Sequence, residues 1–325
     1  MSALSEFSLI KQYFENITTE RSDVILGIGD DCALLKCPKG QQLAVSIDTL
    51  VEGVHFLPDV DPVRLGHKSL AVGLSDLAAM GATPAWFTLA LTLPELDQQW
   101  LAAFSKGLAC LAKLHNIALV GGDTSRGPLS ISIQVHGFVN AEDSLRRDGA
   151  KKGDLIYVTG SLGDAAGALA MKQGKLTKGV ASEVEVNFLC QRLEQPTPRV
   201  EVGQMLVGFA SAAIDISDGL VADLGHILHK SAVGAELDIE DLPISTALSA
   251  LSTEAEHMAL FAGDNYELCF TVPPKHKNQV QKKLKGQCQC TRIGTITGDD
   301  GIVFLKDKKL IKLSGFGYEH FSTGH

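Results

Sequence analysis

The sequence predicts an α/β protein of two domains. Stretches with a strand pattern alternate with amphipathic helical stretches along the whole chain. The alternation starts again after a basic, glycine-containing segment at 146–153, which we interpret as the domain boundary. The length of 325 residues is sufficient for two ordinary domains with buried cores. We therefore expect an N-terminal domain over 1–150 and a C-terminal α/β domain over 151–325.

The first half is expected to contain three helices and several strands. The helices are predicted over 5–16, from Pro62 to about Gly81, and after Asp97. Asp61-Pro62 is typical of an N-cap followed by proline in the first helical turn. Strands are predicted over 42–48, 87–93 and 130–138, and the apolar run 117–120 precedes two glycines and Asp123.

The second half repeats this mixture of elements. A strand is predicted over 155–159 and a helix of small residues from Gly163, followed by a loop or linker over 172–185. The remaining expected elements are helices over 200–210, 220–231 and 277–286 and strands over 267–272 and 302–305. Both halves are therefore expected to pack helices on sheets.

Composition excludes several classes of protein. The net charge of −9 argues against a basic surface for nucleic-acid backbones. We find neither a signal peptide nor an apolar run long enough to span a membrane, so a cytoplasmic location is expected. The seven scattered cysteines fit a reducing compartment, and Cys288-Gln289-Cys290 has no second pair with the spacing of a metal site.

Five short acidic motifs are the most informative feature of the chain. They place aspartates among apolar or small residues, at what we predict to be strand ends and one helix: Asp30, Asp31, Asp48, Asp76, Asp123, Asp215 and Asp218. A half-buried carboxylate either becomes neutral or binds a cation. Aspartate with neighbouring hydroxyl and carbonyl oxygens suits a hard cation such as Mg²⁺. The alternative is that individual aspartates only form turns and helix caps.

The chemistry that fits these motifs is phosphoryl transfer between two phosphate groups. The chain has no Walker A loop, no complete dinucleotide fingerprint and no Gly-x-Ser-x-Gly or His-Glu-x-x-His motif. A phosphate monoester has a second pKa near 6, so it is a nucleophile at neutral pH and needs no general base. Bound cations would offset the repulsion between the two anions. Arg146 or Arg147 either adds a phosphate contact or belongs to a solvated linker, and His55 either contacts substrate or is a loop histidine.

Taken together, the motifs resemble the thiamine-monophosphate kinase family. The resemblance lies in Gly27-Ile-Gly-Asp-Asp-Cys, Asp48-Thr-Leu-Val-Glu-Gly-Val-His55, Leu74-Ser-Asp, Gly121-Gly-Asp-Thr and Ile214-Asp-Ile-Ser-Asp-Gly219, in this order along the chain. It implies ATP-dependent phosphorylation of thiamine monophosphate to thiamine diphosphate by direct in-line transfer. It also implies a fold like that of aminoimidazole ribonucleotide synthetase, with two domains that each pack a mixed sheet with helices, and a homodimer formed through the N-terminal domains.

The resemblance further assigns roles to individual residues. Several Mg²⁺ ions are implied, with ligands at Asp30, Ser46, Ile47 through its carbonyl, Asp48, Asp76, Asp123, Asp215 and Asp218. ATP is implied as co-substrate, with contacts at Gly122, Asp123, Arg147 and Ser217. Thiamine monophosphate is implied at His55, Asp264, Asn265 and Tyr318, where an aromatic ring suits the cationic thiazolium. No catalytic base is expected, because the metals and Arg147 stabilise the transfer.

Two departures from the family pattern bear on these roles. The family reads Gly-Gly-Glu-Asp-Tyr-Glu where this chain has Ala262-Gly-Asp-Asn-Tyr-Glu267, and Thr is expected where Ile47 stands. Two alternatives remain. One is another ATP-dependent enzyme of the same superfamily, such as a selenophosphate synthetase, although this chain has no reactive cysteine ahead of Cys32. The other is a non-catalytic protein that binds Mg·ATP.

Overall fold

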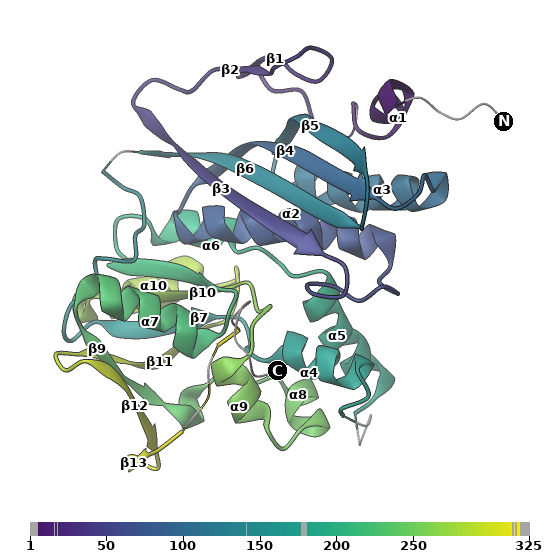
Figure 1. Cartoon of the computed structure of the whole chain (residues 1–325). Helices are drawn as coiled ribbons and strands as arrows, with labels where there is room; N and C mark the ends of the chain where they lie inside the picture. The colour runs from purple at the N-terminus through teal and green to yellow at the C-terminus, as the bar shows by residue number, and fades with distance from the viewer. Residues whose placement is uncertain are drawn as a thin grey trace. The chain divides into compact units, whose positions relative to one another are not determined.

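The computed structural model describes residues 6–15, 17, 19–140, 142–176, 181–313, 315, 317 and 318. The chain forms two compact units, one of residues 1–77 and 82–143 and the other of residues 78–81 and 144–325. Each unit pairs a mixed sheet with helices, so the predicted α/β class is confirmed (Figure 1). None of the helices within the described ranges is long and apolar enough to cross a membrane.

The first unit is built on a four-stranded sheet in the order β3-β6-β4-β5. Only the β4–β5 pair is parallel. A small antiparallel pair, β1 and β2, forms a separate hairpin. The elements of this unit are α1 (Glu6–Tyr13), β1 (Val24–Leu26), β2 (Leu34–Leu35), β3 (Gln41–Val51), α2 (Pro62–Ala79), β4 (Thr83–Leu93), α3 (Gln98–Leu114), β5 (Ala118–Arg126) and β6 (Ser130–Asn140).

The helix starts predicted in this unit are confirmed by their caps. Asp61 directly precedes α2, and its Oδ1 accepts hydrogen bonds from the N–H groups of Val63 and Arg64 in the first turn of the helix. Asp97 caps α3 in the same way, through the N–H groups of Gln99 and Trp100. Such caps satisfy backbone donors that have no partner inside the helix.

Helix α2 packs against one face of the sheet. Its Leu70, Leu74 and Leu77 are fully buried, as are the inward-facing Ile131, Ile133 and Val135 of β6. At Gly73 the helix comes so close to β6 that an added Cβ would lie 2.9 Å from a methyl carbon of Val135. The nearest atom of another residue than Val135 is a carboxylate oxygen of Asp48, which lies 3.6 Å from the same Cβ position. The close approach at Gly73 therefore brings the side chain of Asp48 against α2.

The second unit is built on a seven-stranded sheet in the order β13-β12-β9-β11-β7-β10-β8, in which only β9–β12 is parallel. Its strands are β7 (Leu155–Thr159), β8 (Ala212–Ile216), β9 (Gly234–Asp238), β10 (Glu267–Val272), β11 (Cys290–Thr297), β12 (Gly301–Lys306) and β13 (Lys309–Ile311). Its α-helices are α4 (Asp164–Lys172), α5 (Glu183–Glu194), α6 (Val200–Leu206), α7 (Leu220–Ser231), α8 (Thr246–Leu251), α9 (Ala255–Phe261) and α10 (Lys277–Leu284). Strands β7, β8 and β10 are buried along their whole length.

The structure corrects two predictions about local structure. Asp48 and Asp123 do not end their strands but lie inside β3 and β5, because pairing continues to Val51 and Arg126. The predicted loop over 172–185 is also wrong in its last part. Ser182 caps α5 by a capping box with Glu185, and the helix continues to Glu194. Residues 177–180 lie outside the described ranges.

Candidate functional site

Asp48 and Asp76 form a pair of carboxylates in the first unit. Asp48 and Ser46 are two residues apart on β3, so their side chains lie on the same face of the sheet, against α2. Asp76 lies on α2, and its Oδ2 accepts a short hydrogen bond from the hydroxyl of Ser46. Three oxygen-bearing side chains from two elements therefore meet at this point.

Asp48 lacks the partners that a buried carboxylate needs. Its Oδ2 is buried and meets no hydrogen-bond donor among the described residues. Burial, followed by the negative charge of Asp76, raises the pKa of Asp48 to about 7. A cation would relieve both effects, since it supplies positive charge to an oxygen that has no donor.

The donor set at this point fits Mg²⁺. Two carboxylates and a hydroxyl are hard oxygen ligands, of the type that Mg²⁺ binds while keeping several of its waters. Within the described ranges, no group of three or more His, Cys, Asp or Glu side chains is placed to hold a metal ion. Asp48, Asp76 and Ser46 therefore form an incomplete set of Mg²⁺ ligands.

Asp123 is not part of this group within one copy of the first unit. The strand pairing forms a row across the sheet from Asp48 through Ile133 and Leu89 to Gly122. Three strand spacings of ~4.8 Å separate its ends by about 14 Å. Asp123 follows Gly122 and so points to the opposite face, where its Oδ2 accepts a hydrogen bond of 2.7 Å from Ser125. Ile47 likewise directs its side chain away from the Asp48 face and is 63% exposed.

Asp30 and His55 lie in loops of the first unit. Asp30 is exposed between β1 and β2, and its Oδ1 accepts a hydrogen bond of 2.8 Å from the N–H of Asp31. His55 is half-buried after β3, where its Nδ1 accepts the N–H of Val51 at 3.0 Å. The buried Lys68 of α2 donates to the carbonyl of His55 at 3.3 Å. These bonds hold the imidazole with Nε2 directed away from Val51.

In the second unit, a turn at residues 217–219 joins β8 to α7 and carries two of the predicted site residues. The N–H groups of Ser217, Asp218 and Gly219 all donate to Oδ2 of Asp223, at 3.0, 3.0 and 3.1 Å. Asp223 is 3% exposed, and burial together with the charge of Asp218 raises its pKa to about 7, against the lowering effect of the three N–H groups. A carboxylate of the chain therefore already binds these three backbone donors, so an anion cannot bind them at this turn.

Asp223 was not predicted as a site residue. The available signal was an acid in the first turn of the helix that follows Ser217-Asp-Gly219, a position where negative charge is favourable.

Two other predicted segments contact the 217–219 turn. The N–H of Asp264 donates to the carbonyl of Ser217 at 2.8 Å. The N–H of Tyr318 donates to the carbonyl of Asp218 at 2.9 Å. The buried Asp215 precedes the turn on β8. The structure therefore brings Asp264 and Tyr318, which lie 46 and 100 residues after Asp218 in the sequence, to the turn that follows Asp215.

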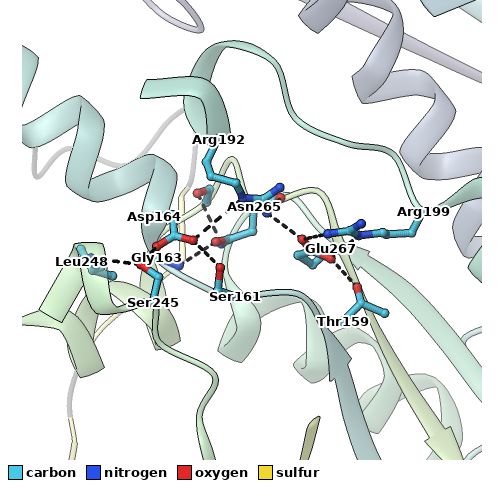
Figure 2. Close-up of polar contacts among 11 residues, drawn as sticks. Thr159, Ser161, Gly163, Asp164, Arg192, Arg199, Ser245, Leu248, Asn265 and Glu267 are labelled. Carbon is cyan, nitrogen blue, oxygen red and sulfur yellow. Dashed lines mark hydrogen bonds and ion pairs between the residues drawn. The ribbon is translucent and has the colours of Figure 1, made fainter. Parts of the chain in front are cut away.

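Asn265 is the exception among the predicted substrate residues. Its side chain is buried and makes hydrogen bonds only within the protein, accepting the N–H of Gly163 at 2.8 Å and donating to the carbonyl of Ala262 at 2.8 Å. The next acid, Glu267, is completely buried and is held by Arg192 and Arg199 (Figure 2). Neither arginine was predicted, because α5 was not recognised and Arg199 lies just before the helix predicted over 200–210.

The two candidate arginines after the first unit differ in their partners. Arg146 forms a two-pronged pair with Asp148, at 3.0 and 2.6 Å. Arg147 is exposed, and within the described part of the chain its guanidinium has no hydrogen-bond partner. Its carbonyl accepts the hydroxyl of Ser231 at 3.0 Å, which fixes its backbone. Arg147 is therefore the arginine with a free phosphate-binding fork.

Comparisons with known proteins give consistent results over the whole chain. Residues 29–139 match the N-terminal domain of AIR synthase related proteins, and residues 151–306 match the C-terminal domain. A thiamine-monophosphate kinase of Salmonella typhimurium is 50% identical over 326 residues, with 99% of each chain covered.

Solved structures agree with this. A crystal structure of thiamine-monophosphate kinase from Stenotrophomonas maltophilia K279a superposes with a TM-score of 0.86 at 48% identity, covering 95% of this chain and 98% of that one. A structure described as AaThiL complexed with AMPPCP and TMP gives a TM-score of 0.76 at 31% identity, covering 98% and 97%. The sequence, the fold and these similarities show that the chain belongs to the thiamine-monophosphate kinase family.

Proposed function

We propose that this chain transfers the γ-phosphoryl group of ATP to the phosphate of thiamine monophosphate, giving thiamine diphosphate and ADP. The observation that carries the proposal is the Asp48–Asp76 pair, in which a buried carboxylate oxygen lacks a donor. A bound Mg²⁺ would neutralise phosphate charge during the transfer. The family membership supports this reaction, and a structure of a 31% identical relative is described as complexed with AMPPCP and TMP.

The roles of the remaining residues follow from charge and placement. Ser46, Asp48 and Asp76 would hold Mg²⁺ in the first unit, and Asp215 and Asp218 are further acids for metal at the 217–219 turn of the second. Arg147 would bind an ATP phosphate with its free fork, and Ser217 would contact the nucleotide through its hydroxyl. Asp264, Tyr318 and His55 would contact thiamine monophosphate, whose thiazolium is attracted by a carboxylate and by an aromatic ring face. Asp30, Asp123, Gly122 and the Ile47 carbonyl remain proposed ligands.

The acceptor phosphate explains why no general base is needed. Its second pKa near 6 leaves a nucleophilic oxygen free of its proton at neutral pH. Free thiamine ends in an alcohol, which keeps its proton at neutral pH and would need a general base. We therefore expect free thiamine to be rejected.

The direct test offers Mg·ATP with thiamine monophosphate in one tube and with free thiamine in a second. ADP and thiamine diphosphate are measured together by chromatography. Diphosphate formed only from the monophosphate, in equal amounts to ADP, is the expected result. ADP without diphosphate would indicate another acceptor, and binding of Mg·ATP without either product would indicate a non-catalytic protein.

We also propose that the chain forms a homodimer through the open face of the first unit. Leu43, Val45 and Ile47 alternate along the edge strand β3 and are 43%, 50% and 63% exposed. Exposed apolar side chains on an edge strand favour pairing with another chain. Asp123 shares this face, so a second copy docked here would lie against it. Val45→Asp should convert the dimer to a monomer in light scattering, and a monomeric wild type would refute the proposal.

The seven cysteines support a cytoplasmic location for this reaction. None of the seven forms a disulfide in the structure, an arrangement that a reducing compartment favours.

A further inference from the structure

A buried ion cluster lies directly behind the 262–266 loop of the second unit. Glu267, the first residue of β10, is completely buried, and both of its carboxylate oxygens are bound (Figure 2). Arg199 donates to Oε2 from Nε and to Oε1 from Nη2, both at 2.6 Å. Arg192 donates from Nη2 to Oε1 at 2.7 Å, and the hydroxyl of Thr159 donates to Oε2. The backbone of Gly160 packs so closely on this carboxylate that a Cβ there would lie 2.1 Å from Oε1.

The cluster is connected to the loop by direct hydrogen bonds. The Nη2 group of Arg192 that binds Glu267 also lies 3.2 Å from the carbonyl of Asn265. The Asn265 side chain spans from Gly163 to the carbonyls of Ala262 and Gly263. Asp164, which follows Gly163, accepts the hydroxyls of Ser161 and Ser245 and lies 3.9 Å from Arg192 Nε. The loop is therefore held at both ends by one polar network.

The loop needs this support because its backbone is strained. Asp264 and Tyr266 have φ angles of +61° and +50°, in the left-handed region that side chains other than glycine rarely adopt. Strained residues of this kind persist only where surrounding contacts determine their conformation. In this conformation, the N–H groups of Asp264 and Tyr266 reach the carbonyls of Ser217 and Ile216, each at 2.8 Å. The hydroxyl of Tyr266 then binds Oδ1 of Asp264 at 2.9 Å.

The unfavourable free energy of burying these charged groups indicates that the cluster does more than stabilise the fold. Burying charged groups is unfavourable, and an ion cluster can often be replaced by well-packed apolar residues without loss of stability. Here two arginines from α5 and the segment before α6 are used to hold one carboxylate beside a strained loop. The backbone of Asp264 is consequently held against the 217–219 turn, and its carboxylate, the acidic group of that loop, accepts the hydroxyl of Tyr266.

We propose that Glu267, Arg192 and Arg199 are positioning residues that hold the 262–266 loop in its strained conformation and thereby set the affinity for the cationic substrate. The proposal rests on the proposed function, in which Asp264 faces the thiazolium of thiamine monophosphate. None of the three residues is required to touch substrate. Their effect is transmitted through the backbone of Asn265 and Tyr266.

The test compares Glu267→Gln with Glu194→Gln. Both changes replace a buried, ion-paired glutamate by its isosteric amide in the same unit, since Glu194 pairs with Lys172 at 2.7 Å. Glu267 contacts the network that holds the loop, whereas the ion pair of Glu194 is formed with Lys172. Arg192→Lys is the milder second variant, because lysine keeps the charge but is shorter and lacks the guanidinium nitrogen Nη2 that binds both Glu267 and Asn265.

Two readouts are measured on each variant. Hydrogen–deuterium exchange of peptides that cover 262–268 reports the bonds of the Asp264 and Tyr266 N–H groups without any use of activity. Steady-state kinetics gives KM for thiamine monophosphate and for Mg·ATP separately. We expect Glu267→Gln and Arg192→Lys to speed exchange in the loop about tenfold and to raise KM for thiamine monophosphate about tenfold, with KM for Mg·ATP within twofold. Glu194→Gln should change none of these.

Three results would overturn the proposal. The first is unchanged hydrogen exchange in the loop of the Glu267 variant. The second is faster exchange there with an unchanged KM for thiamine monophosphate. The third is a rise of KM for thiamine monophosphate and for Mg·ATP that is as large in Glu194→Gln as in Glu267→Gln. If the wild type makes no thiamine diphosphate, the proposed function fails, while the exchange experiment still decides whether the cluster holds the loop. If Glu267→Gln does not fold, Arg192→Lys carries the same test.

Discussion

Asp48 in the first unit and Glu267 in the second are both acids removed from water, yet their surroundings differ. Glu267 is bound by two guanidinium groups and a hydroxyl, so both of its oxygens are satisfied. Asp48 has another carboxylate beside it and an oxygen without a donor, which raises its pKa to about 7. The protein therefore supplies its own cations where a carboxylate holds a loop, and leaves the charge uncompensated where we propose that a metal binds. The predictions below test this difference, from the largest expected effect to the smallest.

Asp48→Asn should remove most of the turnover while leaving the fold intact. The amide keeps the shape of the side chain but cannot provide the negative charge that Mg²⁺ requires. We expect kcat to fall at least about 100-fold at saturating Mg²⁺ when ADP and thiamine diphosphate are measured by chromatography. Circular dichroism serves as the control for folding. Turnover equal to the wild type would exclude Asp48 as a metal ligand and would remove the main argument for the contrast with Glu267.

Asp223→Ala should instead destabilise the protein. Asp223 is an acid whose partners are three backbone N–H groups, and its removal leaves those groups without an acceptor. We expect the free energy of unfolding to fall by about 2–3 kcal/mol in urea titrations. An unchanged unfolding midpoint would show that water replaces the carboxylate at the 217–219 turn.

The pH dependence of stability should reveal the uncompensated charge of Asp48. The pKa of Asp48 is about 7 in the folded protein and ~4 in the unfolded chain, so the folded state binds this proton more tightly. In metal-free protein, the contribution of Asp48 to the free energy of unfolding is present below pH ~4 and is lost as the pH rises through about 7. Asp48→Asn removes this loss and should raise Tm at pH 8 by ~2–4 °C, equivalent to about 1 kcal/mol.

Mg²⁺ provides a second measurement of the same effect. It should raise Tm of the wild type at pH 8 and have a smaller effect on Asp48→Asn, because the ion binds the folded state through this carboxylate. An equal increase of Tm in the wild type and in Asp48→Asn would show that Mg²⁺ does not bind through Asp48.

Arg147→Ala and Arg146→Ala form a matched pair with a smaller expected effect. The guanidinium of Arg147 is free for a phosphate, whereas that of Arg146 is occupied by Asp148. Loss of one charge-assisted bond should raise KM for Mg·ATP about tenfold in Arg147→Ala. Arg146→Ala should stay within about twofold, since an exposed ion pair contributes little. A larger rise of KM for Mg·ATP in Arg146→Ala than in Arg147→Ala would instead identify Arg146 as the phosphate-binding arginine.

Much of the fold was predictable because its signals are local. The caps at Asp61 and Asp97, the strand 155–159 and the helix 220–231 each depend on the periodicity and end residues of their own segment. Helix α5 was missed because its apolar face is interrupted by polar residues and its cap lies beside a polar stretch. The short helices α8 and α9 and the strands β9 and β11 were likewise not predicted.

For the candidate site, the sequence by itself determined which residue types are present and in what order, and these motifs were enough to indicate the family. It did not determine which side chains share a face or a partner. The placement of Asp48 beside Asp76 follows from the packing of α2 on the sheet, and the placement of Asp123 on the opposite face follows from strand register, a property of the whole sheet. The Asn265 side chain is turned inward by Gly163, 102 residues before it, and Glu267 is bound by Arg192 and Arg199, 75 and 68 residues before it. Local propensity carries no information about such distant contacts, so only the tertiary structure decided them.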